Sequence, residues 1–165
     1  SHRDDMTKQD IHQRFIDQLT REVETITAAA KSSFDTATNA EHQAKSKYDT
    51  FSLETSYLAR GQAKRVEELN DALERLQQLP LKALDATTPI LLSALVRLRA
   101  DDGETRALFL GSAAGGEMIS VDGEEIIMVT ARAPLGQAVL GKTVGDTFDI
   151  KMGIDTQTFT VVSVE

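Results

Sequence analysis

The amino-acid sequence predicts an α+β protein in which an N-terminal antiparallel helical hairpin precedes a small antiparallel β domain with one short helix. Residues 7–44 contain neither proline nor glycine, and their apolar residues recur at spacings of three and four, as they do again in residues 59–76. After Pro80 the apolar spacing changes to an alternation of two, interrupted by glycines. The expected parts are a coiled-coil hairpin over residues 6–80, its tip at about 45–58, and a β domain over residues 81–165.

Composition excludes several classes of protein. The chain of 165 residues has no cysteine and no tryptophan, which rules out disulfide scaffolds, thiolate metal sites and thiol catalysis. No apolar run approaches the roughly 18 residues of a membrane-spanning helix. Ser1–Asp5, ahead of Met6, are expected to be a remnant of expression, and no secretion signal is recognisable. We therefore expect a cytoplasmic protein that does not associate with membranes.

The charge argues against binding to free nucleic acid. The net charge is -8, and both halves are acidic: residues 1–80 hold 11 cations and 14 acids, and residues 81–165 hold 7 and 12. Affinity for DNA or RNA rests mainly on cations that face phosphates. A contact with nucleic acid is therefore expected only from a locally basic segment.

The two helices of the predicted hairpin each carry one apolar seam. Two amphipathic helices joined by a short turn fold back on each other, because each then buries its seam against the other. Pro80 ends the second helix, since proline lacks the backbone N–H. We expect a monomer; the alternative is a dimer formed through the same seam. The seam residues are Leu19, Val23, Ile26, Ala30, Ser33, Ala37, Ala40 and Ala44, with Ile11, Phe15 and Phe34 beside them, and then Ala59, Gln62, Val66, Leu69, Leu73 and Leu76.

The segment between the helices, residues 45–65, is basic although the protein is acidic. It holds two acids, Asp49 and Glu54, and we expect Thr50 or Ser52 to cap the second helix. A structural role for Glu54 in the first turn of that helix, and ordinary solvated cations, remain open beside a functional role. Three aromatic residues (Tyr48, Phe51, Tyr57) and five cations (Lys45, Lys47, Arg60, Lys64, Arg65) complete the segment.

The C-terminal half predicts a small sheet. Asp102-Gly103 and Asp122-Gly123 are hairpin signals, and a turn is expected near Gly153. Pro134 to Gly141 is a short helix with proline in its first turn and glycine at its end. Strands are expected at residues 90–99, 105–110, 118–121, 125–130, 147–151 and 158–164.

One segment of this half carries a resemblance to a known family. Residues 133–146 read APLGQAVLGKTVGD. This run resembles the signature in the C-terminal domain of the bacterial Gre transcript-cleavage factors, the GreA/GreB family, in which a Ser-Pro-Leu-Gly-like start leads to Leu-Leu-Gly-Lys and then Gly-Asp. The layout of a helical hairpin before a sheet domain is similar too, over residues 7–165. The resemblance implies that the sheet domain is FKBP-like.

The resemblance also implies a function. A Gre-like factor binds RNA polymerase, docks its globular domain at the rim of the secondary channel and inserts its coiled coil. The tip acids, here Asp49 and Glu54, then help the polymerase hold a Mg²⁺ ion that takes part in hydrolysis of a backtracked transcript. The tip cations would face RNA, and both RNA and DNA would be met only within the polymerase complex. The docking candidates are Pro134, Leu135, Gly136, Leu140, Gly141 and Lys142.

The tip departs from the Gre pattern. Asp49 and Glu54 are five residues apart, whereas the family pattern separates its acids by three. Three residues apart places two carboxylates on one helical face, and five does not. A factor that stimulates cleavage, a silent competitor for the channel, and a coiled-coil interaction protein unrelated to polymerase all remain open.

No enzyme activity or cofactor of its own is expected from this chain. An FKBP-like domain suggests prolyl isomerisation, but residues 81–165 hold no Trp, no Tyr and only three Phe, too few for an aromatic pocket. The three histidines, His2, His12 and His42, have no second ligand at metal-binding spacing, and we expect them on the surface.

Overall fold

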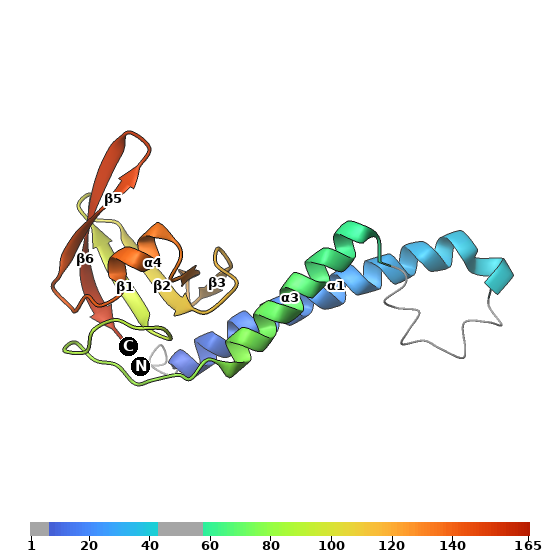
Figure 1. Ribbon diagram of the computed structural model, residues 1–165, viewed down its shortest axis with the longest axis horizontal. Coiled ribbons are helices and arrows are strands. Elements are labelled where there is room, and N and C mark those ends of the chain that lie inside the picture. The colour runs from blue at the N-terminus through green and yellow to red at the C-terminus, as the bar shows by residue number, and fades with distance from the viewer. Residues whose placement is uncertain (1–6, 43–57) are drawn as a thin grey trace. The chain divides into compact units, whose positions relative to one another are not determined.

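The computed structural model describes residues 7–42 and 58–165, with the backbone alone for residues 33–42. The chain forms two compact units, one of residues up to Ile16 together with Glu74–Glu165, and one of Asp17–Leu73. Helices α1 (Lys8–His42) and α3 (Arg60–Gln78) each contribute residues to both units (Figure 1). They run antiparallel, since His12 bonds to Leu76 and Glu22 to Arg65.

The second part of the chain is a six-stranded sheet with one short helix, α4 (Pro134–Val139). The predicted fold class, a helical hairpin followed by a small sheet domain with a single short helix, is confirmed. The strand order is β3-β4-β2-β1-β6-β5. The strands are β1 (Leu95–Ala100), β2 (Thr105–Gly111), β3 (Met118–Val121), β4 (Glu124–Thr130), β5 (Thr147–Met152) and β6 (Asp155–Val164).

The sheet is mixed, so the expectation of a purely antiparallel sheet was wrong at one pairing. β2 and β4 are parallel, with Ala107 opposite Ile126. β3 has only its alternate residues buried, whereas Ile126, Met128 and Val129 of β4 are buried in near succession. A strand that is apolar on both faces belongs inside a sheet, and a half-polar strand belongs at its edge. β4 therefore lies between β3 and β2, antiparallel to β3 and parallel to β2.

A second correction concerns the start of β1. We expected a strand from Ile90, but the pairing begins at Leu95. Ser93 has a φ of 81°, in the left-handed region, and its N–H donates to the Leu110 carbonyl at 2.7 Å. Its hydroxyl accepts from the N–H of Lys82 at 3.1 Å. These bonds hold a turn at Ser93 that interrupts the extended chain before β1.

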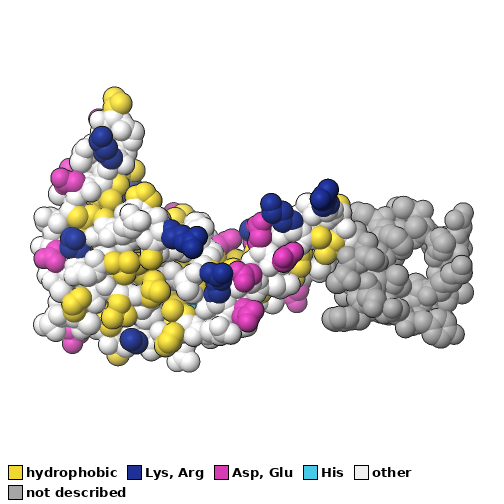
Figure 2. All heavy atoms as spheres, viewed as in Figure 1, with side chains coloured by type: hydrophobic (Ala, Val, Ile, Leu, Met, Phe, Trp, Pro, Cys, Tyr) yellow, Lys and Arg dark blue, Asp and Glu magenta, His cyan; other side chains and the backbone are white. Residues whose placement is uncertain are grey.

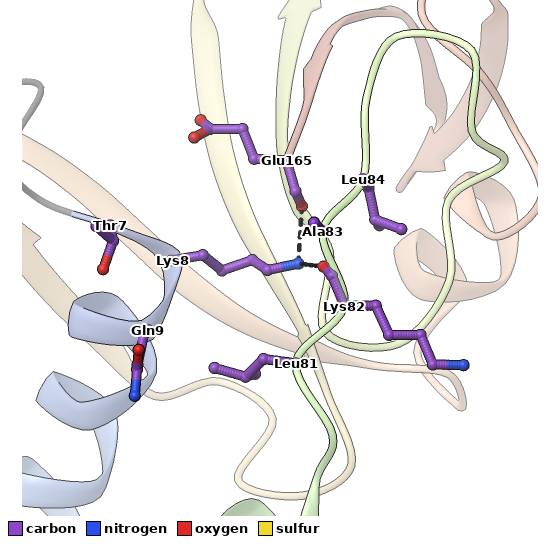
Figure 3. Close-up of a pocket in the computed structure, with 8 residues that line it drawn as sticks. All are labelled: Thr7, Lys8, Gln9, Leu81, Lys82, Ala83, Leu84 and Glu165. Carbon is purple, nitrogen blue, oxygen red and sulfur yellow. Dashed lines mark hydrogen bonds between the residues drawn. The ribbon is translucent and has the colours of Figure 1, made fainter.

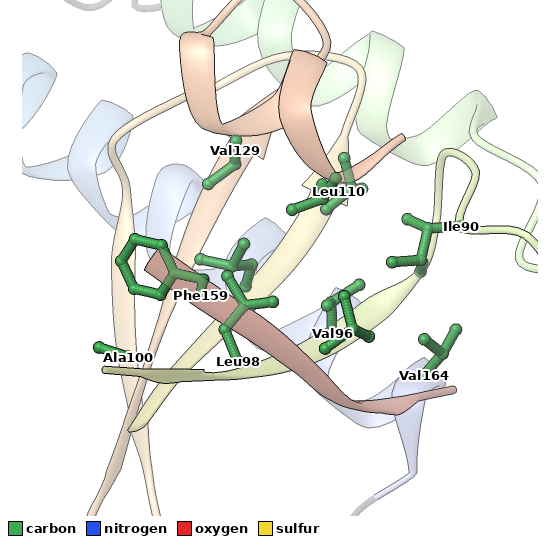
Figure 4. Packing of buried hydrophobic residues seen from close by; sticks show 12 residues of the cluster. Ile90, Val96, Leu98, Ala100, Leu110, Val129, Phe159 and Val164 are labelled. Carbon is green, nitrogen blue, oxygen red and sulfur yellow. The ribbon is translucent and has the colours of Figure 1, made fainter. Parts of the chain in front are cut away.

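One face of the sheet packs against α4. Side chains of β1, β2, β4 and β6 point into a single apolar cluster with the helix (Figure 4). Val139 of α4 is completely buried in this cluster. The cluster comprises Ile90, Ala94, Val96, Leu98, Ala100, Leu108, Leu110, Val129, Val139, Phe159, Val161 and Val164.

The opposite face of the sheet contacts the first turns of α1. The ring of Phe15 lies 5.9 Å from the ring of Phe109 on β2, and both side chains are buried. His12 stacks on the same ring at 5.9 Å, and its Nε2 donates to the Leu76 carbonyl at 2.6 Å. His12 is only 8% exposed, so the expectation of a surface histidine was wrong for this residue. Phe15, which we assigned to the hairpin seam, is a core residue of the sheet unit.

The two helices begin differently. Thr7 and Asp10 form a reciprocal capping box, in which the Thr7 N–H donates to the Asp10 carboxylate at 3.0 Å and the Asp10 N–H to the Thr7 hydroxyl at 3.2 Å. The bond from the Thr7 N–H, followed by a bond between the Thr7 side chain and the carboxylate, lowers the pKa of Asp10. α3 begins at Arg60, where the Gln62 side chain accepts the N–H of Ala59 at 3.0 Å. The Gln62 side chain thus caps the start of α3. Thr50 and Ser52, which we expected as caps, lie outside the described residues.

Candidate functional site

The predicted tip lies almost entirely outside the described residues. That part of the chain includes both acids, Asp49 and Glu54, the three tip aromatics and the cations Lys45 and Lys47. Of the candidate residues named in the segment 45–65, the three cations Arg60, Lys64 and Arg65, all on α3, are described. The roles of the acids and aromatics therefore stay predictions.

The three described cations differ in their surroundings. Arg60 and Lys64 are exposed in the first turns of α3, and Figure 2 shows Lys and Arg side chains over this end of the helix, interspersed with acidic ones. Arg65 donates from both Nε and Nη2 to one carboxylate oxygen of Glu22, at 3.1 and 2.7 Å. Arg65 thus links α3 to α1, and Arg60 and Lys64 present charge to solvent.

The helix pair is held by the seam that the sequence predicted. Leu19 on α1 and Leu69 on α3 are 1% and 2% exposed, and Ala30 is also buried. Val23, Ile26, Val66 and Leu73 are half-buried. Among the described seam residues, the fully buried ones are thus the leucines Leu19, Leu69 and Leu76 and, farther along α1, Ala30.

The segment that resembles the Gre signature forms α4 and the turns after it. Pro134 occupies the first turn, where its missing N–H costs nothing. Gly136 is buried against β4, and a Cβ there would lie 1.9 Å from the carbonyl oxygen of Thr130. Gly141 has a φ of 83°, so it ends the helix in the left-handed conformation that glycine adopts without strain. The fold thus favours glycine at positions 136 and 141 and accommodates the proline at 134.

The end of α4 is hydrogen-bonded to the connector, residues 79–94 between α3 and β1. The N–H of Ile90 donates to the Lys142 carbonyl at 2.8 Å, and the N–H of Gly141 donates to the Ile90 carbonyl at 2.8 Å. Further on, the Asp146 carboxylate accepts the N–H of Thr143 at 2.8 Å. Leu135 and Leu140 pack partly buried against the core. The signature therefore builds a rigid corner of the sheet unit.

Few residues of α4 and its flanking turns are exposed, and the docking candidates chosen from the sequence include only some of them. Of the six docking candidates, Pro134 and Gly141 are exposed, Leu135, Leu140 and Lys142 are half-buried, and Gly136 is buried. Gln137 and Arg132 are exposed beside them. Gln137 was missed because the resemblance rests on the apolar and glycine positions of the motif, which are those that the fold requires.

A groove lies at the base of α1, beside the connector. It has a volume of about 640 Å³ and is open to solvent (Figure 3). Lys8 reaches into it and donates from Nζ to the carbonyls of Lys82 and Glu165, the latter at 3.2 Å. Burial lowers the pKa of Lys8, and the negative charge of Glu165 partly opposes that shift. The groove residues are Thr7, Lys8, Gln9, Leu81, Lys82, Ala83, Leu84 and Glu165.

The polar contacts in this groove connect parts of the fold. Lys8 donates to the backbone oxygens of Lys82, in the connector, and of Glu165, directly after β6. It thus joins α1 to both segments. Among the residues that the structure describes, no three His, Asp or Glu side chains lie close enough together to hold a metal ion. None of the described helices has the length and apolar character that crossing a membrane requires.

No family model and no curated protein matches the chain. Several solved structures do. The transcription factor Gfh1 is 23% identical, with 93% of this chain and 92% of that chain covered and a TM-score of 0.41. GreA factor homolog 1 of Thermus thermophilus is 20% identical over 91% and 94%, with a TM-score of 0.37. A prokaryotic transcription elongation factor GreA/GreB from Nitrosomonas europaea is 22% identical over 58% and 77%, at 0.36.

Proposed function

We propose that this chain is a Gre-like regulator that binds bacterial RNA polymerase in the cytoplasm. The observation that carries the proposal is the segment of residues 133–146, which resembles the Gre signature and forms the corner of α4 on a sheet that follows an antiparallel helix pair. In this proposal the exposed side of α4, with Pro134, Gln137 and Arg132, docks on the polymerase. The helix pair then presents its tip to the secondary channel.

The tip acts on the polymerase's own reaction, and the chain has no catalysis of its own. Asp49 and Glu54 are proposed to supply carboxylate oxygens to a Mg²⁺ ion that the polymerase holds, since oxygen ligands are what this ion prefers. Arg60 and Lys64, which are exposed at the start of α3, are proposed to lie near RNA phosphates. Nucleic acid is then contacted only within the polymerase complex.

Transcript cleavage tests the proposal. A purified, backtracked polymerase complex is incubated with the chain, and the release of short 3′ RNA fragments is followed. The wild type is expected to accelerate release, and Asp49→Ala combined with Glu54→Ala is expected to abolish the acceleration. Glu24→Ala combined with Glu67→Ala is the matched control, because it removes two exposed carboxylates from the shafts of the same helices. Equal loss with this control pair would count against a specific role of the tip.

A second candidate function rests on the spacing of the tip acids. Asp49 and Glu54 are five residues apart, a separation that does not place two carboxylates on one helical face. A silent occupant of the channel would compete with a cleavage factor without stimulating cleavage. Inhibition of an added cleavage factor by both the wild type and the tip variant is the result expected of this candidate.

Docking is tested separately by binding. Arg132→Glu reverses an exposed charge beside α4 and is expected to weaken binding to the polymerase about tenfold or more, as the loss of a charge contact at an interface does. Arg99→Glu is the matched control, because Arg99 is an exposed arginine of β1, away from α4. Equal binding by both variants would place the docking surface elsewhere.

A further inference from the structure

The β5–β6 hairpin extends the sheet beyond its neighbours. β1 pairs with β6 only from Phe159 onward, whereas β5 pairs with β6 out to Met152 and Asp155. A two-residue turn closes the hairpin, with Gly153 at a φ of 69°. Figure 1 shows this hairpin projecting from the rest of the sheet, and β5 is a terminal strand in the sheet order. The outer edge of β5 is therefore a candidate interaction surface.

The register of β5 and β6 determines which backbone groups of β5 face outward. Val161 donates to the Asp146 carbonyl at 2.9 Å, on the β5 side, while the Thr158 carbonyl accepts from Asp101 at 2.9 Å, on the β1 side. Odd-numbered residues of β6 thus bond toward β5. They are paired with the even-numbered residues of β5, as Phe159 is with Phe148. Since bonding alternates along an antiparallel ladder, Thr147, Asp149 and Lys151 direct their N–H and C=O groups to the open edge.

When the β5 sequence is reversed, its apolar positions coincide with themselves and its acid and base exchange places. Phe148-Asp149-Ile150-Lys151-Met152 places an apolar residue at each end, an isoleucine in the centre, and one acid and one base at equal distances from it. Phe148, Ile150 and Met152 share one face of the hairpin because side chains alternate along a strand. Asp149 and Lys151 share the other face and are both exposed.

The apolar face continues past the core of the sheet unit. Phe148 stacks on Phe159 at 5.8 Å, and Phe148 and Ile150 pack partly buried against the core cluster. Beyond them Met152 is 47% exposed and Ile154, in the turn, is 100% exposed. Figure 2 shows apolar side chains at the end of this hairpin, with charged ones beside it. The strip thus has apolar surface left to bury against a partner.

We propose that this edge pairs with the same edge of a second copy of the chain, antiparallel, about a two-fold axis at Ile150. The outward-facing residues of β5 are odd-numbered, so an odd-numbered residue of one copy must lie opposite an odd-numbered residue of the other. The two-fold axis therefore passes through a residue and not between two residues. An axis at Asp149 or at Lys151 would set like charges opposite each other. An axis at Ile150 sets Asp149 opposite Lys151 of the second copy twice, and Phe148 opposite Met152, and opposite-charge pairs across strands are stabilising.

The pairing is small, which determines how it is to be observed. One strand from each copy buries far less than the roughly 800 Å² per partner of a standard stable interface. Association is therefore weak and depends on concentration, and dilute protein is monomeric. Charged residues on an edge strand also serve in other proteins to prevent pairing. That use predicts no association at any concentration, so measurement separates the two.

Substitutions that exchange the charges of Asp149 and Lys151 test the proposal. The experiment uses the full chain without polymerase, so its outcome is independent of the proposed function. Sedimentation velocity of the wild type from micromolar to millimolar protein is expected to show a monomer–dimer equilibrium. Asp149→Lys alone and Lys151→Asp alone each set like charges opposite each other, so each is expected to raise the dimer Kd about tenfold or more. The double exchange, D149K with K151D, is expected to restore it.

Mixing the two single variants is the most specific arm. D149K and K151D are expected to form a mixed dimer, because every acid then faces a base, although neither variant pairs with itself. Glu125→Lys is the matched control: it reverses an exposed charge on β4, away from β5, and is expected to leave the dimer unchanged. Thermal unfolding of each variant checks that the fold is kept, because Asp149 accepts a hydrogen bond from Thr158 at 2.7 Å.

Hydrogen exchange tests directly which amides of β5 face the open edge. The amides of Asp149 and Lys151 are expected to exchange more slowly as the wild-type concentration rises, while that of Ile150, already bonded to β6, does not change. The proposal is overturned by a wild type that stays monomeric at millimolar concentration, by a dimer that D149K leaves unaffected, or by single variants that fail to associate when mixed.

Discussion

Gly136 of α4 lies directly on the backbone of β4, and a Cβ at this position would come within 1.9 Å of the carbonyl oxygen of Thr130. The same atom would lie 2.9 Å from the Thr130 carbonyl carbon. Because both contacts are with backbone, the clash cannot be relieved by rotation of a side chain. The glycine in the signature is thus explained by the packing of α4 on the sheet.

Gly136→Ala is expected to lower the free energy of unfolding by about 3 kcal/mol, the upper range for overpacking a core, because α4 must lift from β4. Chemical denaturation followed by far-UV circular dichroism measures the change. Gln137→Ala is the control, since Gln137 is exposed on the same helix and its loss is expected to change stability by less than about 0.5 kcal/mol. Equal stability of the two variants would show that α4 does not need this close approach.

Phe15→Ala is expected to destabilise the sheet unit although Phe15 belongs to α1. The ring is completely buried against Phe109, and removing a buried phenylalanine costs about 3–5 kcal/mol. Hydrogen exchange of β2 and β4 amides should accelerate in this variant. Gln9→Ala, an exposed change on the same helix, should leave those rates as they are. Faster exchange confined to the helix pair would contradict the assignment of Phe15 to the core of the sheet unit.

The ion pair of Arg65 with Glu22 is expected to contribute little stability. Their side chains are 44% and 34% exposed, and pairs in such surroundings contribute about 0–1 kcal/mol. A double-mutant cycle of Glu22→Ala and Arg65→Ala measures the coupling, which should shrink as salt is added. A coupling well above this range that resists salt would mean that the pair holds the two helices together.

Asp85 provides a prediction on pH. Its carboxylate accepts from the hydroxyl and the N–H of Thr87 and from the hydroxyl of Thr88, and these bonds lower its pKa, with the Thr87 hydroxyl contributing most. A carboxyl group with a lowered pKa contributes stability above its unfolded pKa and loses it as the pH falls through the folded value. Thr87→Val should therefore raise the pKa of Asp85, as measured by NMR titration of its carboxyl carbon. Asp122, exposed in another turn, is the reference site. An unchanged Asp85 pKa in T87V would rule out the Thr87 hydroxyl as the cause.

Much of the architecture could be predicted because it depends on local chemistry. The spacing of Leu19, Leu69 and their neighbours predicted the helix pair, and alternation predicted β2, β3 and β4 to within a residue. Pro134 and Gly141 marked both ends of α4, since one lacks a donor and the other tolerates positive φ. The candidate site was predicted as a segment, residues 133–146, by resemblance. The tip acids lie outside the described residues and stay predictions.

What only the tertiary structure decided depends on residues far apart in the sequence. The sequence by itself determined the type and order of the elements through spacing, prolines and glycines. It did not determine that β4 lies beside β2, or that a turn at Ser93 makes β1 begin at Leu95. Nor did it determine that Phe15, expected in the hairpin seam, and His12, expected on the surface, are buried against the sheet. Each of these follows from burial against distant partners such as Phe109 and Leu110, and no local pattern encodes which partner a strand or ring will meet. The local spacing of apolar residues determines whether a segment forms a helix or a strand. Burial against distant residues determines its position in the fold.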